Sequence, residues 1–158
     1  MNSFLQFLEK NGRKRVILDR ASKAPYLTRY YLLLKDREKF PFNAFLHNFH
    51  QSDPDDLHDH PWPYFTFILK GGYWEWIPII LEGIIVGERK VWRGRGHFRI
   101  CKANSYHRIE IEPTVDCWTL FIPGPQKREW GFLTHKSWKL ETQKWIKHNE
   151  YIDRRKHI

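Results

Sequence analysis

Short runs in which apolar and polar residues alternate recur along the chain, separated by Gly, Pro, Asn and Asp. Alternation with a period of two is typical of β-strands that bury one face. It predicts strands at residues 16–18, 26–34, 42–50, 64–70, 73–80, 84–86, 90–92, 97–101, 106–111 and 117–122. Strands at such short intervals favour an all-β barrel or jelly roll, and no linker or repeat divides the 158 residues. We therefore expect one domain with its barrel core in residues 26–125.

Helical spacing is confined to the two ends of the chain. Residues 4–10 follow Ser3, a residue type that caps helices, and precede Gly12, a residue type that ends them. In residues 140–149, Leu140, Lys144 and His148 follow one another at the helical interval of four, with Trp145 and Ile146 available for docking. The pattern predicts one short helix near each terminus.

Two adjacent glycines, Gly71 and Gly72, separate the strands predicted at residues 64–70 and 73–80. Glycine adopts the backbone conformations of tight turns without steric cost. We expect these two strands to form a hairpin, with further turns at residues 82–83 and 87–88.

Candidate chemistry centres on His58 and His60, which one residue separates. In an extended chain their side chains project from the same face, ~7 Å apart along the backbone. Imidazole is a good ligand for Zn, Fe, Ni or Cu, and His107, near the start of a later strand, is the candidate third ligand. Pro61 and Pro63 cannot donate ladder hydrogen bonds, so the backbone here is expected to be irregular or at a sheet edge.

The segment around these histidines resembles the first motif of the cupin superfamily. That motif has His-X-His, three or four residues, Glu, six residues and Gly. Here His58 and His60 keep their places, Tyr64 stands where Glu is expected, and Gly71 follows at the right spacing. Replacing Glu with Tyr64 removes a negative charge and supplies a phenol that could donate a hydrogen bond or simply pack.

The segment around His107 resembles the second cupin motif. Gly96 and His107 keep their spacing, while Lys102 replaces a Pro, Asn104 replaces a turn Gly and Ile111 replaces a final Asn. A closer resemblance is to small cupin-like proteins of bacteria and phages, carried by residues 57–62, 71–75, 118–125 and 129–132. The resemblance implies a double-stranded β-helix, the cupin-type jelly roll.

The same resemblance implies that His58, His60 and His107 hold one divalent metal. Fe(II) is the first expectation, as in the three-His cupin thiol dioxygenases, with Zn, Mn or Ni as alternatives. Hydrogen-bond acceptors behind the rings would have to fix their tautomers, and we expect Asp56 and Asp59 in that role, with Glu75 or backbone carbonyls as alternatives. The catalytic candidates are Tyr64 and Glu75.

The charge of the chain favours an anionic partner. Lys and Arg number 27 against 18 Asp and Glu, a formal charge of +9. Much of the excess lies in residues 13–15 and 154–156, and no zinc-finger, RNP-like or helix-turn-helix pattern is present. We therefore expect an anionic small molecule and no specific nucleic acid. The candidate ligand-binding residues are Arg93, Arg95, Arg99 and His47, although either His47 or His50 could be the one that faces the interior.

The two cysteines, Cys101 and Cys117, are too few for a disulfide framework, and no apolar run is long enough for a membrane span. We expect a cytoplasmic protein that does not bind a membrane. A homodimer is one of the oligomeric states that the sequence allows. Three functions are open: a metal-dependent enzyme of oxygenase type, a non-catalytic ligand-binding cupin, and a metal-free isomerase like the sugar-nucleotide epimerases, with a His base and a Tyr acid.

Overall fold

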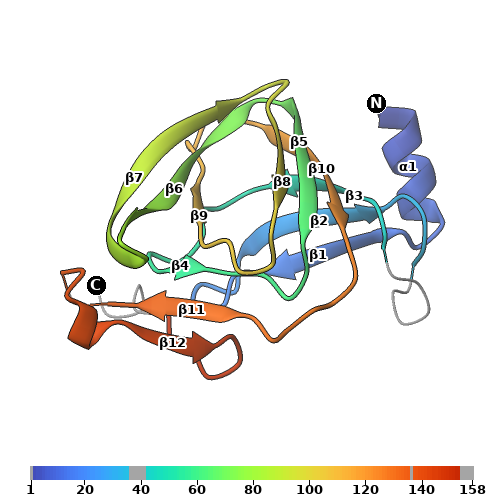
Figure 1. The fold of residues 1–158 in the computed structure, drawn as a ribbon. Coiled ribbons are helices and arrows are strands. Elements are labelled where there is room, and N and C mark those ends of the chain that lie inside the picture. Colours follow the sequence, from blue (N-terminus) through green and yellow to red (C-terminus); the bar gives the residue numbers. More distant parts are fainter. Residues whose placement is uncertain (1, 36–41, 136, 154–158) are drawn as a thin grey trace.

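The computed structural model describes residues 2–35, 42–135 and 137–153. Three antiparallel sheets account for most of it (Figure 1). Their strand orders are β1-β2-β3-β10-β5-β8, β7-β6-β9 and β12-β11-β4. The strands are β1 (Lys14–Leu18), β2 (Pro25–Tyr31), β3 (Phe45–Phe49), β4 (Leu57–His58), β5 (Tyr64–Lys70), β6 (Gly72–Leu81), β7 (Ile84–Gly94), β8 (Phe98–Cys101), β9 (Arg108–Glu110), β10 (Cys117–Pro123), β11 (Gly131–Thr134) and β12 (Lys144–Lys147).

The predicted all-β jelly roll is confirmed. The β7-β6-β9 sheet lies across the interior from β5, β8 and β10, so that the two sheets enclose a core between them (Figure 1). One buried cluster contains residues from both sheets, namely Leu27, Phe49, Ile68, Tyr73, Ile109 and Cys117. Within the described parts of the chain, no helix is long and apolar enough to cross a membrane. The basic segment 154–156 lies outside the described residues.

The hairpin predicted around Gly71 and Gly72 is wrong. β5 pairs with β10 and β8, whereas β6 pairs with β7 and β9, so the glycines carry the chain from one sheet to the other. Gly71 has φ +67°, and a Cβ there would lie 2.6 Å from the Asp116 carbonyl oxygen. Only glycine fits this conformation and this close approach.

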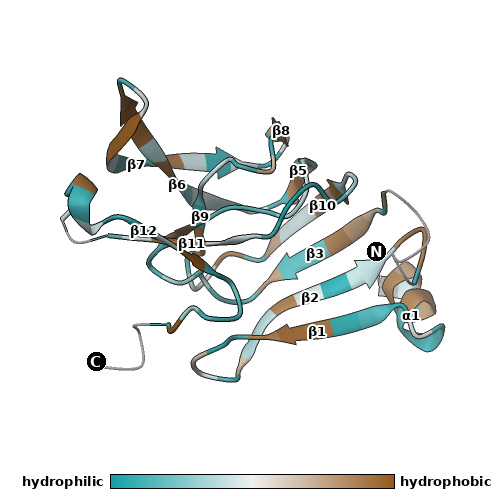
Figure 2. Cartoon of the chain, turned by 60° about the horizontal axis from the view of Figure 1, so that its bottom comes forward, coloured by the Kyte–Doolittle hydropathy of each residue, from teal (hydrophilic) through white to brown (hydrophobic). Residues whose placement is uncertain are grey.

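The turn predicted at residues 87–88 is also wrong, because β7 runs unbroken from Ile84 to Gly94. Gly87 lies opposite Ile79 in the ladder with β6. The turn at Glu82 and Gly83 is confirmed, since both residues have positive φ. The tip of this hairpin is hydrophobic (Figure 2), and Leu81 there is 61% exposed, so it adds nothing to the core.

The N-terminal helix is confirmed as α1 (Asn2–Lys10), although Ser3 lies inside it and does not precede it. Leu8 is buried against Tyr30 and Trp118, so one apolar stripe of the helix docks on the outer side of the large sheet. Gly12, at φ +64°, ends the helix as expected.

The C-terminal helix expected at residues 140–149 is wrong. A 3-10 turn (Leu140–Thr142) leads into β12, which pairs with β11. Tertiary contacts override the helical spacing here. Asp59 is fully buried and accepts hydrogen bonds from the Trp145 indole (3.2 Å) and the Gly131 backbone amide (2.8 Å). Arg128 adds an ion pair at 3.0 Å, and together these contacts hold the β11–β12 hairpin against the segment that carries His60.

Asp59→Ala is expected to lower the free energy of unfolding by about 2 to 4 kcal/mol, because it leaves a buried amide and an arginine without their acceptor. Urea denaturation of the variant beside Asp55→Ala, a change at an exposed aspartate, measures this. If Asp59→Ala kept its stability and lost only bound metal, the carboxylate would instead serve the histidines.

Candidate metal centre

Three histidines meet where the two motif segments pair. His58 ends β4, and two backbone hydrogen bonds join it to His107, with N···O distances of 2.8 and 3.0 Å. His60 follows in an irregular segment before Pro61, and its amide donates to the Ala103 carbonyl at 3.0 Å. The backbone therefore fixes all three side chains in place before any ligand binds.

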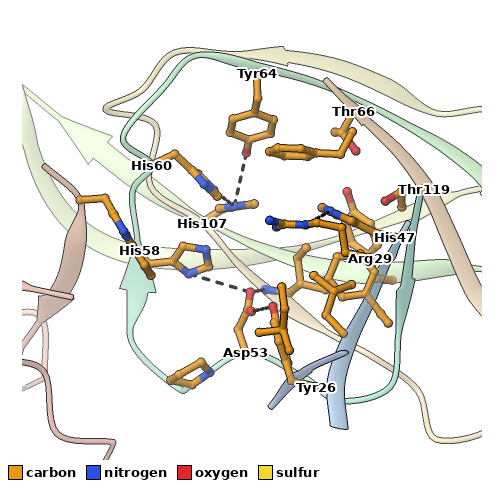
Figure 3. A pocket seen from close by; sticks show the side chains of 18 of the residues that line it. Tyr26, Arg29, His47, Asp53, His58, His60, Tyr64, Thr66, His107 and Thr119 are labelled. Carbon is orange, nitrogen blue, oxygen red and sulfur yellow. Dashed lines mark hydrogen bonds and ion pairs between the residues drawn. The ribbon is translucent and has the colours of Figure 1, made fainter. Parts of the chain in front are cut away.

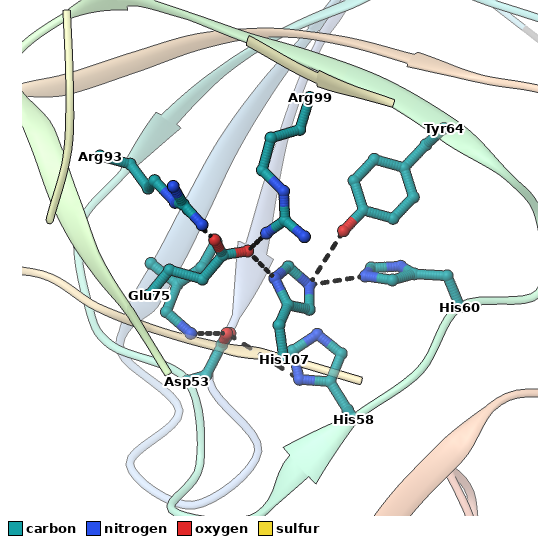
Figure 4. A network of polar contacts seen from close by, with 9 residues as sticks. Asp53, His58, His60, Tyr64, Glu75, Arg93, Arg99 and His107 are labelled. Carbon is teal, nitrogen blue, oxygen red and sulfur yellow. Dashed lines mark hydrogen bonds and ion pairs between the residues drawn. The ribbon is translucent and has the colours of Figure 1, made fainter. Parts of the chain in front are cut away.

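The rings converge on one point (Figure 4). One candidate ligand atom from each of His58, His60 and His107 lies within 4.8 Å of the other two. The Nε2 atoms of His60 and His107 are 2.9 Å apart. Two nitrogens bound ~2.1 Å from one ion at a right angle would be ~3.0 Å apart, so this spacing fits a shared metal.

Burial keeps the imidazoles of His58 and His60 neutral, the form that binds a metal. Loss of hydration lowers the pKa of His58 to about 4, even though the nearby Asp53 carboxylate opposes the shift. Burial also lowers the pKa of His60 well below its usual value, and the neighbouring His107 and His58 add to this. His58 and His60 therefore offer neutral nitrogens to an ion.

Glu75 orients the ring of His107. Its carboxylate is 1% exposed and lies 2.9 Å from His107 Nδ1. Arg93 donates to Oε2 of this carboxylate at 2.8 Å, and Arg99 donates to Oε1, the oxygen that also contacts His107 (Figure 4). Burial alone would raise the pKa of Glu75, but the His107 hydrogen bond and the two guanidinium groups lower it to about 2. An ionised Glu75 holds the proton on Nδ1 and leaves the Nε2 lone pair toward the centre.

Asp53 stands beside His58, with its Oδ2 3.9 Å from Nδ1. It accepts hydrogen bonds from the Ile109 amide (2.5 Å) and from the Tyr26 hydroxyl. This role has no local signature in the sequence, because Asp53 is one of several acids in a turn-like stretch. Its partners come from β2 and β9, far away in the sequence.

Asp56 and Asp59, which we expected to accept hydrogen bonds from the histidine rings, have other partners. Asp56 accepts a hydrogen bond from the Tyr151 hydroxyl at 2.9 Å, and Asp59 braces the β11–β12 hairpin. Both are buried. Of the acids within the described ranges, Glu75 and Asp53 are the ones that the structure places beside the rings.

Tyr64 points into the interior, as its spacing from the histidines predicted. The side chain is 5% exposed, and its hydroxyl lies 3.3 Å from His107 Nε2. Burial raises the pKa of Tyr64 well above its usual value, with the neighbouring Cys101 adding to the shift. The residue in the place of the motif Glu is therefore a neutral hydrogen-bond donor and not an anion.

The arginines predicted to bind a ligand are arranged differently from expectation. Arg93 and Arg99 are ion-paired with Glu75, and Arg95 is exposed. His47 does line the cavity, and its Nε2 accepts a hydrogen bond from Arg29 Nε at 3.0 Å. Arg29 was missed by sequence reasoning, since a single arginine in a strand looks like an ordinary surface residue.

A cavity of about 340 Å³ opens beside the three histidines (Figure 3). Eight of its 24 lining residues are Phe, Tyr or Trp, among them Phe49, Tyr73 and Phe121. A cavity of this size with a few convergent polar groups is typical of small-molecule sites.

No family model matches the chain, and no curated protein matches it. Solved structures match, among them the polyketide cyclase RemF from Streptomyces resistomycificus, with a TM-score of 0.57 and 16% identity over 80% of this chain and 86% of that one. A cupin-2 domain protein from Rhodospirillum rubrum gives 0.53 and 13% over 77% and 76%. The Fe(II) form of HppE gives 0.52 and 11% over 71% of this chain and 57% of that one. The chain thus has the cupin fold, as its two motifs predicted.

The stability of the metal-free protein is expected to fall as pH decreases from 6.5 to 4. His58 stays neutral in the folded state down to about pH 4, while the unfolded chain takes up the proton near pH 6.5, so protonation favours unfolding across this range. The full contribution is about 3 kcal/mol. Urea denaturation between pH 7 and 4 should show a flatter dependence in His58→Asn than in wild type. Identical curves would contradict a neutral buried His58, and the exposed His50→Asn serves as the control.

Proposed function

We propose that this chain is a metal-dependent cupin enzyme in which His58, His60 and His107 hold one divalent ion. The observation that carries the proposal is the convergence of the His58, His60 and His107 imidazoles on one point at the wall of a small-molecule cavity. Fe(II) is the proposed ion. It is supported by the 2.9 Å distance between His60 Nε2 and His107 Nε2, which suits two ligands at a right angle around an octahedral ion, and by the structural likeness to Fe(II) HppE. The proposed reaction is of the oxygenase type.

A bound ion would supply Lewis acidity and open positions for substrate. Residues of the chain would orient the histidines and donate a hydrogen bond to the substrate. Glu75 keeps His107 in one tautomer, and Asp53 is the nearest acceptor for His58 Nδ1. Tyr64, held protonated by burial, can donate its hydroxyl hydrogen to an oxygen atom of the substrate near His107. The aromatic walls exclude water from this place.

The proposed substrate is an anionic small molecule and not a nucleic acid, because a cavity of about 340 Å³ suits a small molecule and the net charge of +9 favours an anion. We also propose a reducing, cytoplasmic location, which suits Cys101 and Cys117 as buried free thiols.

A metal-free acid–base function is the second candidate, because the described contacts already form a proton path. His60 Nε2 and His107 Nε2 lie within hydrogen-bond distance, and the Tyr64 hydroxyl approaches the same nitrogen of His107. A base and an acid would then act on the substrate without an ion, as in an epimerase-like isomerase. Metal content separates the two functions, and a lack of turnover with bound metal would favour the ligand-binding alternative.

Wild-type protein loaded with Fe(II), Mn(II), Ni(II) and Zn(II) in turn should retain one ion per chain. His58→Ala, His60→Ala and His107→Ala should each lose stoichiometric metal and remain folded, because each removes one of three ligands. His50→Ala and His135→Ala, at histidines outside the cluster, should keep it. Inductively coupled plasma mass spectrometry with circular dichroism measures both properties. Retention of none of the four ions by wild type would remove the metal centre and leave the acid–base function.

Glu75→Gln should weaken metal binding by about 10- to 100-fold, because the His107 tautomer is no longer fixed by an anion. Competition with a chelator of known affinity measures the change. Glu110→Gln is the matched control, since Glu110 is likewise ion-paired, to Lys90, and binds the Trp76 indole instead of a histidine. Equal effects of the two changes would mean that Glu75 acts through general stability.

A further inference from the structure

A row of three polar side chains crosses the inner face of the large sheet. Arg29 of β2 lies directly opposite His47 of β3, and His47 lies directly opposite Thr119 of β10. Directly paired residues of neighbouring strands point to the same face. All three line the cavity, and Figure 3 places them on one side of it with the three metal-ligand histidines on the other.

Arg29 brings a positive charge into this cavity, and the two acids of the lining are engaged elsewhere: Asp19 accepts from the Ala21 and Ser22 amides, and Asp53 from Tyr26 and the Ile109 amide. Arg29 Nε donates to His47 Nε2 at 3.0 Å, and its guanidinium lies 4.6 Å from the centre of the Phe45 ring. Among the residues that the structure describes, no carboxylate is ion-paired with it. The other arginine of the cavity, Arg20, instead donates to the His148 carbonyl.

His47 fixes the direction of the guanidinium. The side chain is 4% exposed. Burial, and then the Arg29 charge, lower the pKa of His47 well below its usual value, so the ring is neutral and its Nε2 accepts from Arg29. Nε is occupied by His47 and the Tyr31 hydroxyl also interacts with the guanidinium, which leaves its remaining N–H groups as donors for a ligand.

Thr119 provides a second unfilled group in the same row. The residue is 1% exposed, and within the described chain its hydroxyl has no hydrogen-bond partner. A buried hydroxyl left unpaired costs about 1 to 3 kcal/mol, so such groups in native proteins usually face a ligand or water. An oxyanion between the Arg29 guanidinium and the Thr119 hydroxyl would satisfy both.

We propose that Arg29 and Thr119 bind the carboxylate of a monoanionic substrate, with His47 as the residue that positions Arg29. The inference rests on the proposed function, because the remainder of the substrate would reach His58, His60 and His107 across the cavity. Between the two ends lies Phe121, whose ring stacks on His47 at 5.1 Å and on Tyr64 at 5.0 Å. The substrate class is therefore a carboxylic acid with an apolar or aromatic body.

A single charge is favoured over two. One guanidinium and one neutral hydroxyl can compensate one negative charge, whereas the second charge of a phosphate monoester would be buried without a partner at this end. A carboxylate also matches the planar donor geometry of arginine.

Binding of matched ligands to metal-free protein tests the proposal by isothermal titration calorimetry. The probes are hexanoate and 3-phenylpropionate, their primary amides, and 2-phenylethyl phosphate. Each carboxylate should bind about 10- to 100-fold more tightly than its amide, because the charge-assisted hydrogen bonds are lost in the amide. The phosphate ester should bind more weakly than 3-phenylpropionate. Tighter binding of the phosphate ester, or no preference for carboxylate over amide, would overturn the proposal.

Three variants locate the preference. Arg29→Gln should reduce the ratio of the two affinities to about 1, and Thr119→Val should weaken carboxylate binding by about 3- to 10-fold. Arg95→Gln, at an exposed arginine, should change neither. If Arg29→Gln does not fold, Arg29→Lys, which keeps the charge but not the paired donors, should give an intermediate ratio. A carboxylate preference that survives in both Arg29 and Thr119 variants would contradict the assignment.

The same experiment separates this proposal from the proposed function. A carboxylate preference in a protein that retains no metal would leave the anion site in place and remove the metal-dependent enzyme. Stoichiometric metal in a protein that does not prefer carboxylates would support the metal centre and remove the anion site.

Discussion

The pair of backbone hydrogen bonds between His58 and His107 is the contact on which the rest of the site depends. It joins two segments that are far apart in the sequence and belong to different sheets. β4, which ends at His58, is held on its other side by β11, and His107 leads directly into β9. Because main-chain atoms make this contact, the side chains on either side of it are free for chemistry. The Asp59 contacts and the crossing at Gly71 keep these segments in register with the barrel.

The second organising feature is the position of the negative charge. Where the first cupin motif has Glu, this chain has Tyr64, a neutral phenol, and the nearest buried carboxylate is Glu75 behind His107. The charge of Glu75 is balanced by Arg93 and Arg99, which leaves little of it for an ion in front of the histidine. A divalent ion held by three neutral rings would keep its full charge. Together with Arg29, such an ion would favour the anionic substrate that we propose.

Patterns that depend on local physics were predictable from the sequence. The alternation that gave residues 64–70 as a strand matches β5 to the residue, and the same period placed Tyr64 inside. What failed depends on distant partners. Residues 140–149 have helical spacing, but pairing with β11 makes part of them a strand. The ion pair between Arg93 and Glu75 could not be predicted, because it joins two different strands. The position of Arg29 in the cavity likewise depends on the pairing of β2 with β3.

The most direct test of the metal centre is a crystal structure of Fe(II)-loaded protein with anomalous differences recorded on both sides of the iron absorption edge. One peak is expected within ~2.0–2.2 Å of a ring nitrogen of His58, His60 and His107, with Glu75 still bonded to His107 and the Tyr64 hydroxyl unligated. The absence of a peak there, with His60 and His107 still hydrogen-bonded to each other, would contradict the account. So would an iron bound by Asp53 and other acids in place of the three rings.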